Sequence, residues 1–178
     1  MSIHNLTINK TDIEFLNSFN DEFSSVAISL CPLLKKFSIY IVNHNTTDYA
    51  DVAQLNENDA FAFYINKEEE DASSTYAEII VNKDLCNTLK LTKQEIKAAV
   101  AHEIGHIITF FRTDKDKFQK QDEEYYSDSY ACRMGLTIPL SFLLNKLIES
   151  GLYSESQVLL IKKRLSSIEL LNYDTNSV

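Results

Sequence analysis

The sequence is poor in residues that interrupt regular structure: its 178 residues include three glycines, two prolines and no tryptophan. This scarcity excludes collagen-like and low-complexity classes and favours a helix-rich architecture. The three cysteines are odd in number and far apart, so they match neither a disulfide framework nor a CxxC zinc knuckle; they are Cys31, Cys86 and Cys132. We therefore predict reduced cysteines in a cytoplasmic protein.

Basic residues and long apolar runs are also scarce. The chain has 17 lysines and arginines against 26 aspartates and glutamates, a net charge of −9, so it should repel nucleic-acid phosphates and anionic lipids. The longest apolar run, residues 26–34, contains Pro32 and is far shorter than the about 18 residues that a membrane span needs. We expect a soluble protein with no membrane span, no nucleic-acid partner and no targeting signal.

The chain does contain enough apolar sequence for one folded domain. Apolar residues make up 44% of it, and a chain of this length can bury a large core. No repeat or linker divides the sequence, so we predict a single domain over residues 1–178.

Short sequence signals place the secondary structure within this domain. Capping boxes begin at Thr11, Thr92 and Ser154, and the segment from Thr137 to Pro139 fits another helix start. The predicted helices cover about 11–31, 92–112, 122–134, 137–148 and 154–171. Runs rich in β-branched and aromatic residues predict strands over 37–42, 60–65 and 76–81.

One predicted helix contains an HExxH sequence, formed by His102, Glu103 and His106. Residues four apart on a helix lie one turn above each other, so the two imidazoles can bind one ion while Glu103 lies beside it. Apolar residues on both sides would bury this helix, where a bare pair of histidines needs partners. A zinc ion would be such a partner.

The next predicted helix carries two carboxylates four residues apart, Glu124 and Asp128. A catalytic zinc commonly takes three protein ligands, so Glu124 can complete a set of two histidines and a glutamate; Glu123 is the alternative. Asp128 can accept the remaining N–H of a ligating imidazole. Small residues on the same face would let the two helices approach closely; they include Ser127, Ala131 and Gly135.

The pair HExxH and ExxxD on consecutive helices resembles the gluzincin metallopeptidases. The span from about Asp59 to Leu147 is similar to the HtpX and CAAX prenyl protease type, whose patterns are an xELxAVLAHExGHI helix and an ExxADxxAxxxxG helix. Residues 60–63, AFAF, are similar to the NAFA motif of that type. The chain departs from it in Asp59 for the motif asparagine, in Ser127 for an alanine, and in lacking transmembrane helices and a longer insertion. It is closest to a minimal soluble relative.

The resemblance implies an α+β fold, a zincin-like metallopeptidase domain with a small mixed sheet, an active-site helix and a glutamate helix. It implies a Zn²⁺ ion bound by His102, His106 and Glu124. Asp128 would accept a hydrogen bond from a ligating imidazole, and Glu103 would be the general base of peptide-bond hydrolysis. The partner is then a peptide or protein substrate, which could pair with the AFAF segment if that segment is an edge strand. The oligomeric state stays open.

Two other functions remain possible at this point. A weaker resemblance to the ImmA/IrrE-type metallopeptidases, whose glutamate helix ends in an LLMP stretch, suggests a regulatory protease specific for one partner. The other function is a non-catalytic, zinc-stabilised peptide-binding protein, against which the intact Glu103 argues. We expect His4 and His44 at the surface, and core or groove positions for Tyr125, Tyr126 and Tyr130.

Overall fold

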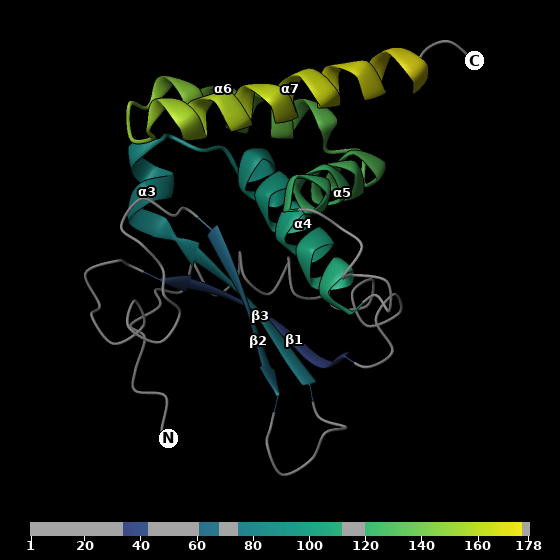
Figure 1. Ribbon diagram of the computed structural model, residues 1–178. Helices are drawn as coiled ribbons and strands as arrows, with labels where there is room; N and C mark the ends of the chain where they lie inside the picture. The colour runs from purple at the N-terminus through teal and green to yellow at the C-terminus, as the bar shows by residue number, and fades with distance from the viewer. Residues whose placement is uncertain (1–33, 43–60, 68–74, 112–119, 176–178) are drawn as a thin grey trace. The chain divides into compact units, whose positions relative to one another are not determined.

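The computed structural model describes residues 34–42, 61–67, 75–111 and 120–175 (Figure 1). Within these residues three strands come first: β1 (Leu34–Val42), β2 (Phe61–Lys67) and β3 (Thr75–Asn82). The described helices follow: α3 (Lys83–Thr88), α4 (Lys93–Phe110), α5 (Lys120–Arg133), α6 (Thr137–Glu149) and α7 (Glu155–Thr175).

The three strands pair in the order β1-β3-β2. β3 is parallel to β1 and antiparallel to β2, and its Ile79 lies opposite Ile39 on one side and Phe63 on the other. Ile79 and Ile80 of β3 are at most 1% exposed. Because consecutive side chains of a strand point to opposite faces, both faces of this central strand are covered.

The predicted fold class, an α+β zincin-like domain with a small mixed sheet, is wrong. Among the residues whose side chains the structure describes, 77% are helical and β3 is the single short strand, so this part of the protein is mostly helical. The strand-forming runs are short, and from Lys83 onwards every described element is a helix. The prediction overestimated the share of strand, because it counted three short strand-forming runs as equal to a long, glycine-poor helical sequence.

α4 begins where the capping box predicts. The Thr92 hydroxyl accepts a hydrogen bond from the Glu95 N–H, and the Glu95 carboxylate accepts one from the Thr92 N–H. Glu95 is only 4% exposed, and its carboxylate also lies 2.7 Å from the Lys146 ammonium of α6. Lys146 further donates to the Lys90 carbonyl. This cluster ties α6 to the start of α4.

The last three helices also follow local signals. α5 ends before Gly135, which has a φ of +76° and donates its N–H to the Cys132 carbonyl. α6 begins at Thr137 as predicted, and three leucines of its apolar face are buried. At the start of α7, the Ser154 N–H bonds the Gln157 side chain, and the Gln157 N–H bonds the Ser154 hydroxyl. α4 packs against α5 and α6, and α7 packs against α5 and α6.

The chain divides into two compact units, Met1–Cys86 and Asn87–Val178. The predicted site residues and α4 to α7 all belong to the second unit, and the single domain over 1–178 stays a prediction. Residues 61–63 of the AFAF segment lie on β2, at one edge of the described sheet. The predicted first helix, His4, His44 and Asp59 lie outside the described residues.

Candidate metal centre

α4 carries the two histidines of the HExxH sequence on one side. His102 and His106 are one turn apart, and their Nε2 atoms lie 3.0 Å from each other. The two rings are edge to face, with centroids 4.7 Å apart. His102 is buried at 6% exposure, whereas His106 is partly exposed. The helix thus directs two imidazole nitrogens to one point, as the spacing predicts.

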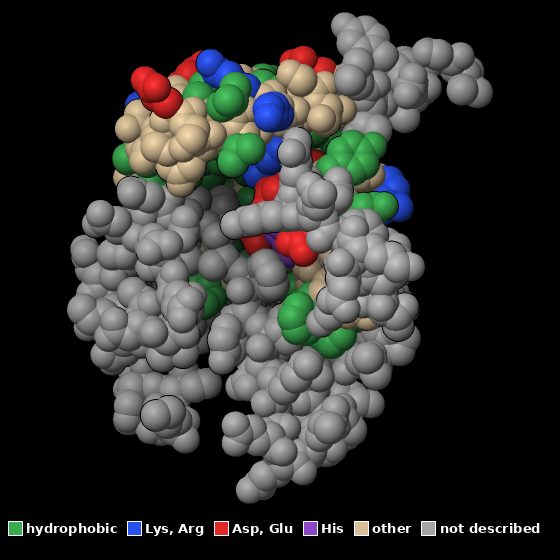
Figure 2. All heavy atoms as spheres, in the orientation of Figure 1, with side chains coloured by type: hydrophobic (Ala, Val, Ile, Leu, Met, Phe, Trp, Pro, Cys, Tyr) green, Lys and Arg blue, Asp and Glu red, His purple; other side chains and the backbone are tan. Residues whose placement is uncertain are grey.

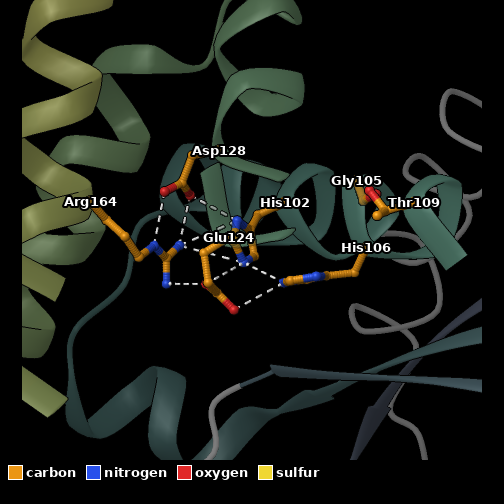
Figure 3. Close-up of polar contacts among 7 residues, drawn as sticks. All are labelled: His102, Gly105, His106, Thr109, Glu124, Asp128 and Arg164. Carbon is orange, nitrogen blue, oxygen red and sulfur yellow. Dashed lines mark hydrogen bonds and ion pairs between the residues drawn. The ribbon is translucent and has the colours of Figure 1, made fainter. Parts of the chain in front are cut away.

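α5 brings a carboxylate to the same point (Figure 3). Glu124 Oε2 lies 3.5 Å from His102 Nε2, and Glu124 Oε1 lies 3.4 Å from His106 Nε2. Among the residues that the structure describes, these three are the group able to hold a metal ion, with ligand atoms all within 4.8 Å of one another. Glu123, the alternative in the sequence, is not part of this group.

The spacing of the three side chains fits a tetrahedral zinc ion. With zinc bonds of about 2.0–2.1 Å, the ligand atoms of a tetrahedron lie about 3.4 Å apart. The two Nε2 atoms lie 3.0 Å apart, and each lies near a different oxygen of Glu124: His106 Nε2 is 3.4 Å from Oε1, and His102 Nε2 is 3.5 Å from Oε2. Two imidazoles and one carboxylate are also a donor set that catalytic zinc uses, with a fourth position left for water. Both the spacing and the chemistry of the donors are therefore suited to zinc.

A close contact between two small residues brings α4 and α5 together. A Cβ atom placed on Gly105 would lie 2.5 Å from the Ser127 Cα, a distance too short for any side chain. Ser127 and Ala131 are fully buried on the facing side of α5. Gly105 lies next to His106, so the contact occurs where the ligands of the two helices meet. The small-residue face predicted from the sequence therefore forms part of this helix contact.

Asp128 lies behind His102, one turn after Glu124. Its Oδ1 is 2.8 Å from His102 Nδ1, and the residue is only 3% exposed. A carboxylate accepts hydrogen bonds, so this contact fixes a proton on Nδ1 and orients Nε2 toward His106 and Glu124. This is the geometry expected for a residue that holds a ligating imidazole in place.

Arg164 of α7 joins the cluster, and it was not among the residues predicted from the sequence. Its Nε donates to Asp128 Oδ2 at 2.9 Å and its Nη2 donates to Asp128 Oδ1 at 2.7 Å, a bidentate pair. Its Nη1 lies 2.9 Å from Glu124 Oε2. A signal existed in the sequence, because Arg164 lies between Ile161 and Ile168, which are both buried. A charged residue on the apolar face of a helix indicates a buried partner.

The contacts shift the pKa values of the cluster. Burial alone would raise the pKa of the Glu124 and Asp128 carboxyls, but hydrogen bonds from His102 and the charge of Arg164 hold both well below their usual range. Burial and the Arg164 charge lower the pKa of His102, but its hydrogen bonds to Asp128 and Glu124 outweigh them and raise it to about 9. Both carboxylates are therefore ionised at neutral pH and attract positive charge to the imidazoles.

Glu103 adds a third carboxylate to this group. It follows His102 on α4, is partly exposed, and its charge acts on Arg164. Burial lowers the pKa of Arg164, but the charges of Asp128, Glu124 and Glu103 raise it overall. With both imidazoles neutral, as metal binding requires, three carboxylates and one guanidinium leave two negative charges, which one divalent cation would neutralise. Acidic, basic and histidine side chains are visible next to one another on the face shown in Figure 2.

The tyrosines of α5 differ in their surroundings. Tyr130 is 7% exposed, which agrees with a core position. Tyr125 is 46% exposed, so it is not a core residue, and its ring contacts that of Tyr126 edge to face.

Comparisons with known proteins identify no relative. The chain matches no protein-family model, no curated protein and no solved structure. The resemblance to gluzincin metallopeptidases therefore depends on the motif residues alone and stays a prediction. Among the described residues, no helix is long and apolar enough to cross a membrane.

Proposed function

We propose that the chain is a zinc-dependent metallopeptidase that hydrolyses bonds within a peptide or protein substrate. One observation carries this proposal: the ligand atoms of His102, His106 and Glu124 lie within 4.8 Å of one another, and Glu103 directly follows His102. Two imidazoles, a carboxylate ligand and a neighbouring free carboxylate are the residue types that zinc-dependent hydrolysis needs.

Each residue of the cluster has a distinct task in this proposal. His102, His106 and Glu124 would hold the ion, and Asp128 would keep the His102 imidazole in the correct tautomer. Zinc held there supplies a water whose pKa falls from about 15.7 towards about 7, and it polarises the carbonyl of the substrate. The protein's contribution is a fixed set of ligands and a proton acceptor at their side.

Glu103 is the catalytic residue of the proposal. Its carboxylate takes a proton from the attacking water and passes it to the nitrogen of the leaving amine. A non-catalytic, zinc-stabilised peptide-binding protein has no use for a carboxylate at this position, so Glu103 favours the enzyme. A regulatory protease specific for one partner would use the same chemistry and differ in its range of substrates.

We further propose a cytoplasmic location, on the basis of the cysteines. Cys86 and Cys132 are free thiols. Burial raises the pKa of the Cys86 thiol to about 12, which keeps it protonated and unreactive. Free, protected thiols are typical of proteins in a reducing compartment.

Metal analysis of the purified protein tests the ligand set. We expect about one zinc per chain in the wild type and almost none in the His102→Ala, His106→Ala double variant. Glu123→Gln is the matched control, because it removes a carboxylate from α5 next to Glu124 but outside the ligand group. A wild type that contains no metal and does not take up added zinc would refute the proposal.

Peptide hydrolysis by Glu103→Gln tests the catalytic role. This change keeps the shape of the side chain and removes the proton acceptor, so zinc content should stay normal while kcat falls by about 10²- to 10⁴-fold. Unchanged cleavage by this variant would remove Glu103 from the mechanism. Tight binding of peptides by the wild type without cleavage of any of them would instead support the peptide-binding function.

A further inference from the structure

The two oxygens of the Glu124 carboxylate lie near different histidines, at nearly the same distance. Oε2 is 3.5 Å from His102 Nε2, and Oε1 is 3.4 Å from His106 Nε2. By distance alone, an ion beside these imidazoles can be bound by either oxygen or by both. The difference matters chemically, because a second oxygen would fill the position that catalytic zinc keeps for water.

Arg164 makes the two oxygens unequal (Figure 3). Its Nη1 lies 2.9 Å from Glu124 Oε2, while its Nε and Nη2 hold the two oxygens of Asp128. The guanidinium is a rigid planar fork, so Nη1 cannot turn away without breaking the pair with Asp128. A positive donor on Oε2 directs that oxygen's electron density toward the guanidinium and leaves Oε1 as the stronger ligand atom.

The position of Arg164 is itself fixed by the packing of α7. Ile161 and Ile168, one turn to either side, are 7% and 0% exposed. The Arg164 side chain is only 20% exposed, and the Asp128 side chain that it grips is 4% exposed. The guanidinium therefore has a defined place between two carboxylates that come from another helix, α5.

We propose that Arg164 is a positioning residue that makes Glu124 a one-oxygen metal ligand. By holding Oε2, it presents Oε1 to the ion and keeps one coordination position open. The inference rests on the proposed function, because it requires that the group of His102, His106 and Glu124 holds a metal. It assigns to Arg164 no contact with the substrate.

Cobalt(II) is a suitable probe, because four-coordinate cobalt absorbs visible light far more strongly than cobalt with five or six ligands. The variants are Arg164→Gln, which removes the charge and the fork, and Arg164→Lys, which keeps the charge alone. Lys163→Gln is the matched control, since Lys163 is the exposed neighbour of Arg164 on α7. Each protein is titrated with cobalt to saturation, and affinity and visible absorbance are both measured.

We expect Arg164→Gln to bind cobalt about 10-fold more weakly and, once saturated, to lose most of the visible absorbance. Arg164→Lys should be intermediate in absorbance, because an ammonium cannot hold both carboxylates in one fixed geometry. The control should match the wild type in affinity and in spectrum. A saturated Arg164→Gln protein with the spectrum of the wild type would overturn the inference.

Circular dichroism before the titration shows whether each variant is folded. If the Arg164 variants do not fold, a crystal structure of the zinc-loaded wild type decides: one Glu124 oxygen is expected at bonding distance from zinc, and both oxygens at bonding distance would overturn the one-oxygen role. A wild type that binds neither metal refutes the proposed function and, with it, this inference. A wild type that binds zinc through both Glu124 oxygens refutes the inference alone.

Discussion

Two buried clusters of charge lie along α4, and they differ in their balance. At the start of the helix, the Glu95 carboxylate lies 2.7 Å from the Lys146 ammonium, one negative charge against one positive charge. In the middle of the helix, Arg164 contacts the Glu124 and Asp128 carboxylates, and the charge of Glu103 also acts on it. Each cluster contains a buried carboxylate, Glu95 at 4% and Asp128 at 3% exposure, so burial does not distinguish them. The second cluster has more negative than positive side chains, which supports the proposed metal site.

Among single substitutions in the two clusters, Asp128→Ala should have the largest effect on zinc affinity. It removes the acceptor of the His102 Nδ1 proton, 2.8 Å away, and one partner of Arg164. We expect zinc affinity to fall by about 10- to 100-fold, measured by competition with a chelating dye. Activity should recover partly with excess zinc. An unchanged affinity would show that Asp128 does not position the ligand.

Gly105→Ala should have the next largest effect, because it acts on the helix contact beside the ligands. The new Cβ would lie 2.5 Å from the Ser127 backbone, so α4 and α5 would have to separate. We expect a loss of about 1–2 kcal/mol in unfolding free energy, from overpacking that exceeds the helix propensity gained, and weaker zinc binding. Gln94→Ala, at an exposed position of α4, is the control. A more stable Gly105→Ala protein would contradict the close contact.

Glu95→Gln should have the smallest effect, a loss of unfolding free energy that depends on pH. Burial would raise the pKa of Glu95, but the Lys146 and Thr92 hydrogen bonds hold it below its ordinary value of 4.5. The stabilisation is therefore present above pH 4.5 and is lost as the pH falls through the lowered pKa. We expect the variant to be about 1 kcal/mol less stable than the wild type at pH 7, with a difference that narrows in acid.

Urea unfolding at a series of pH values measures this difference, and Glu149→Gln, an exposed change on α6, is its control. Zinc affinity of Glu95→Gln should match that of the wild type, because the balanced cluster has no part in the ligand set. A large loss of zinc affinity in this variant would mean that the two clusters are not independent.

Local signals explain which features the sequence could predict. The capping box at Thr92 and the four-residue spacing of His102 and His106 operate within one or two helical turns, so they survive any arrangement of the other helices. Strand positions were also close to those observed. The predicted fold class was wrong because the relative extent of helices and strands depends on the whole chain. The short helix α3 was missed because its six residues show no clear hydrophobic periodicity.

Arg164 shows where prediction from one sequence fails. It lies 36 residues after Asp128, and their contact depends on how α7 packs against α5. Lys162, Lys163 and Arg164 are consecutive, and only the rotation of the helix decides which of them points inward. Its position between two buried isoleucines was the usable signal. The two carboxylates four residues apart on α5 were the other, because such a pair in a packed helix needs a positive partner.

The division of the chain into two units has a consequence for how its sequence can change. Every proposed ligand, the proposed proton acceptor and both proposed positioning residues belong to Asn87–Val178. A substitution within Met1–Cys86 therefore changes none of the side chains that are proposed to bind the ion.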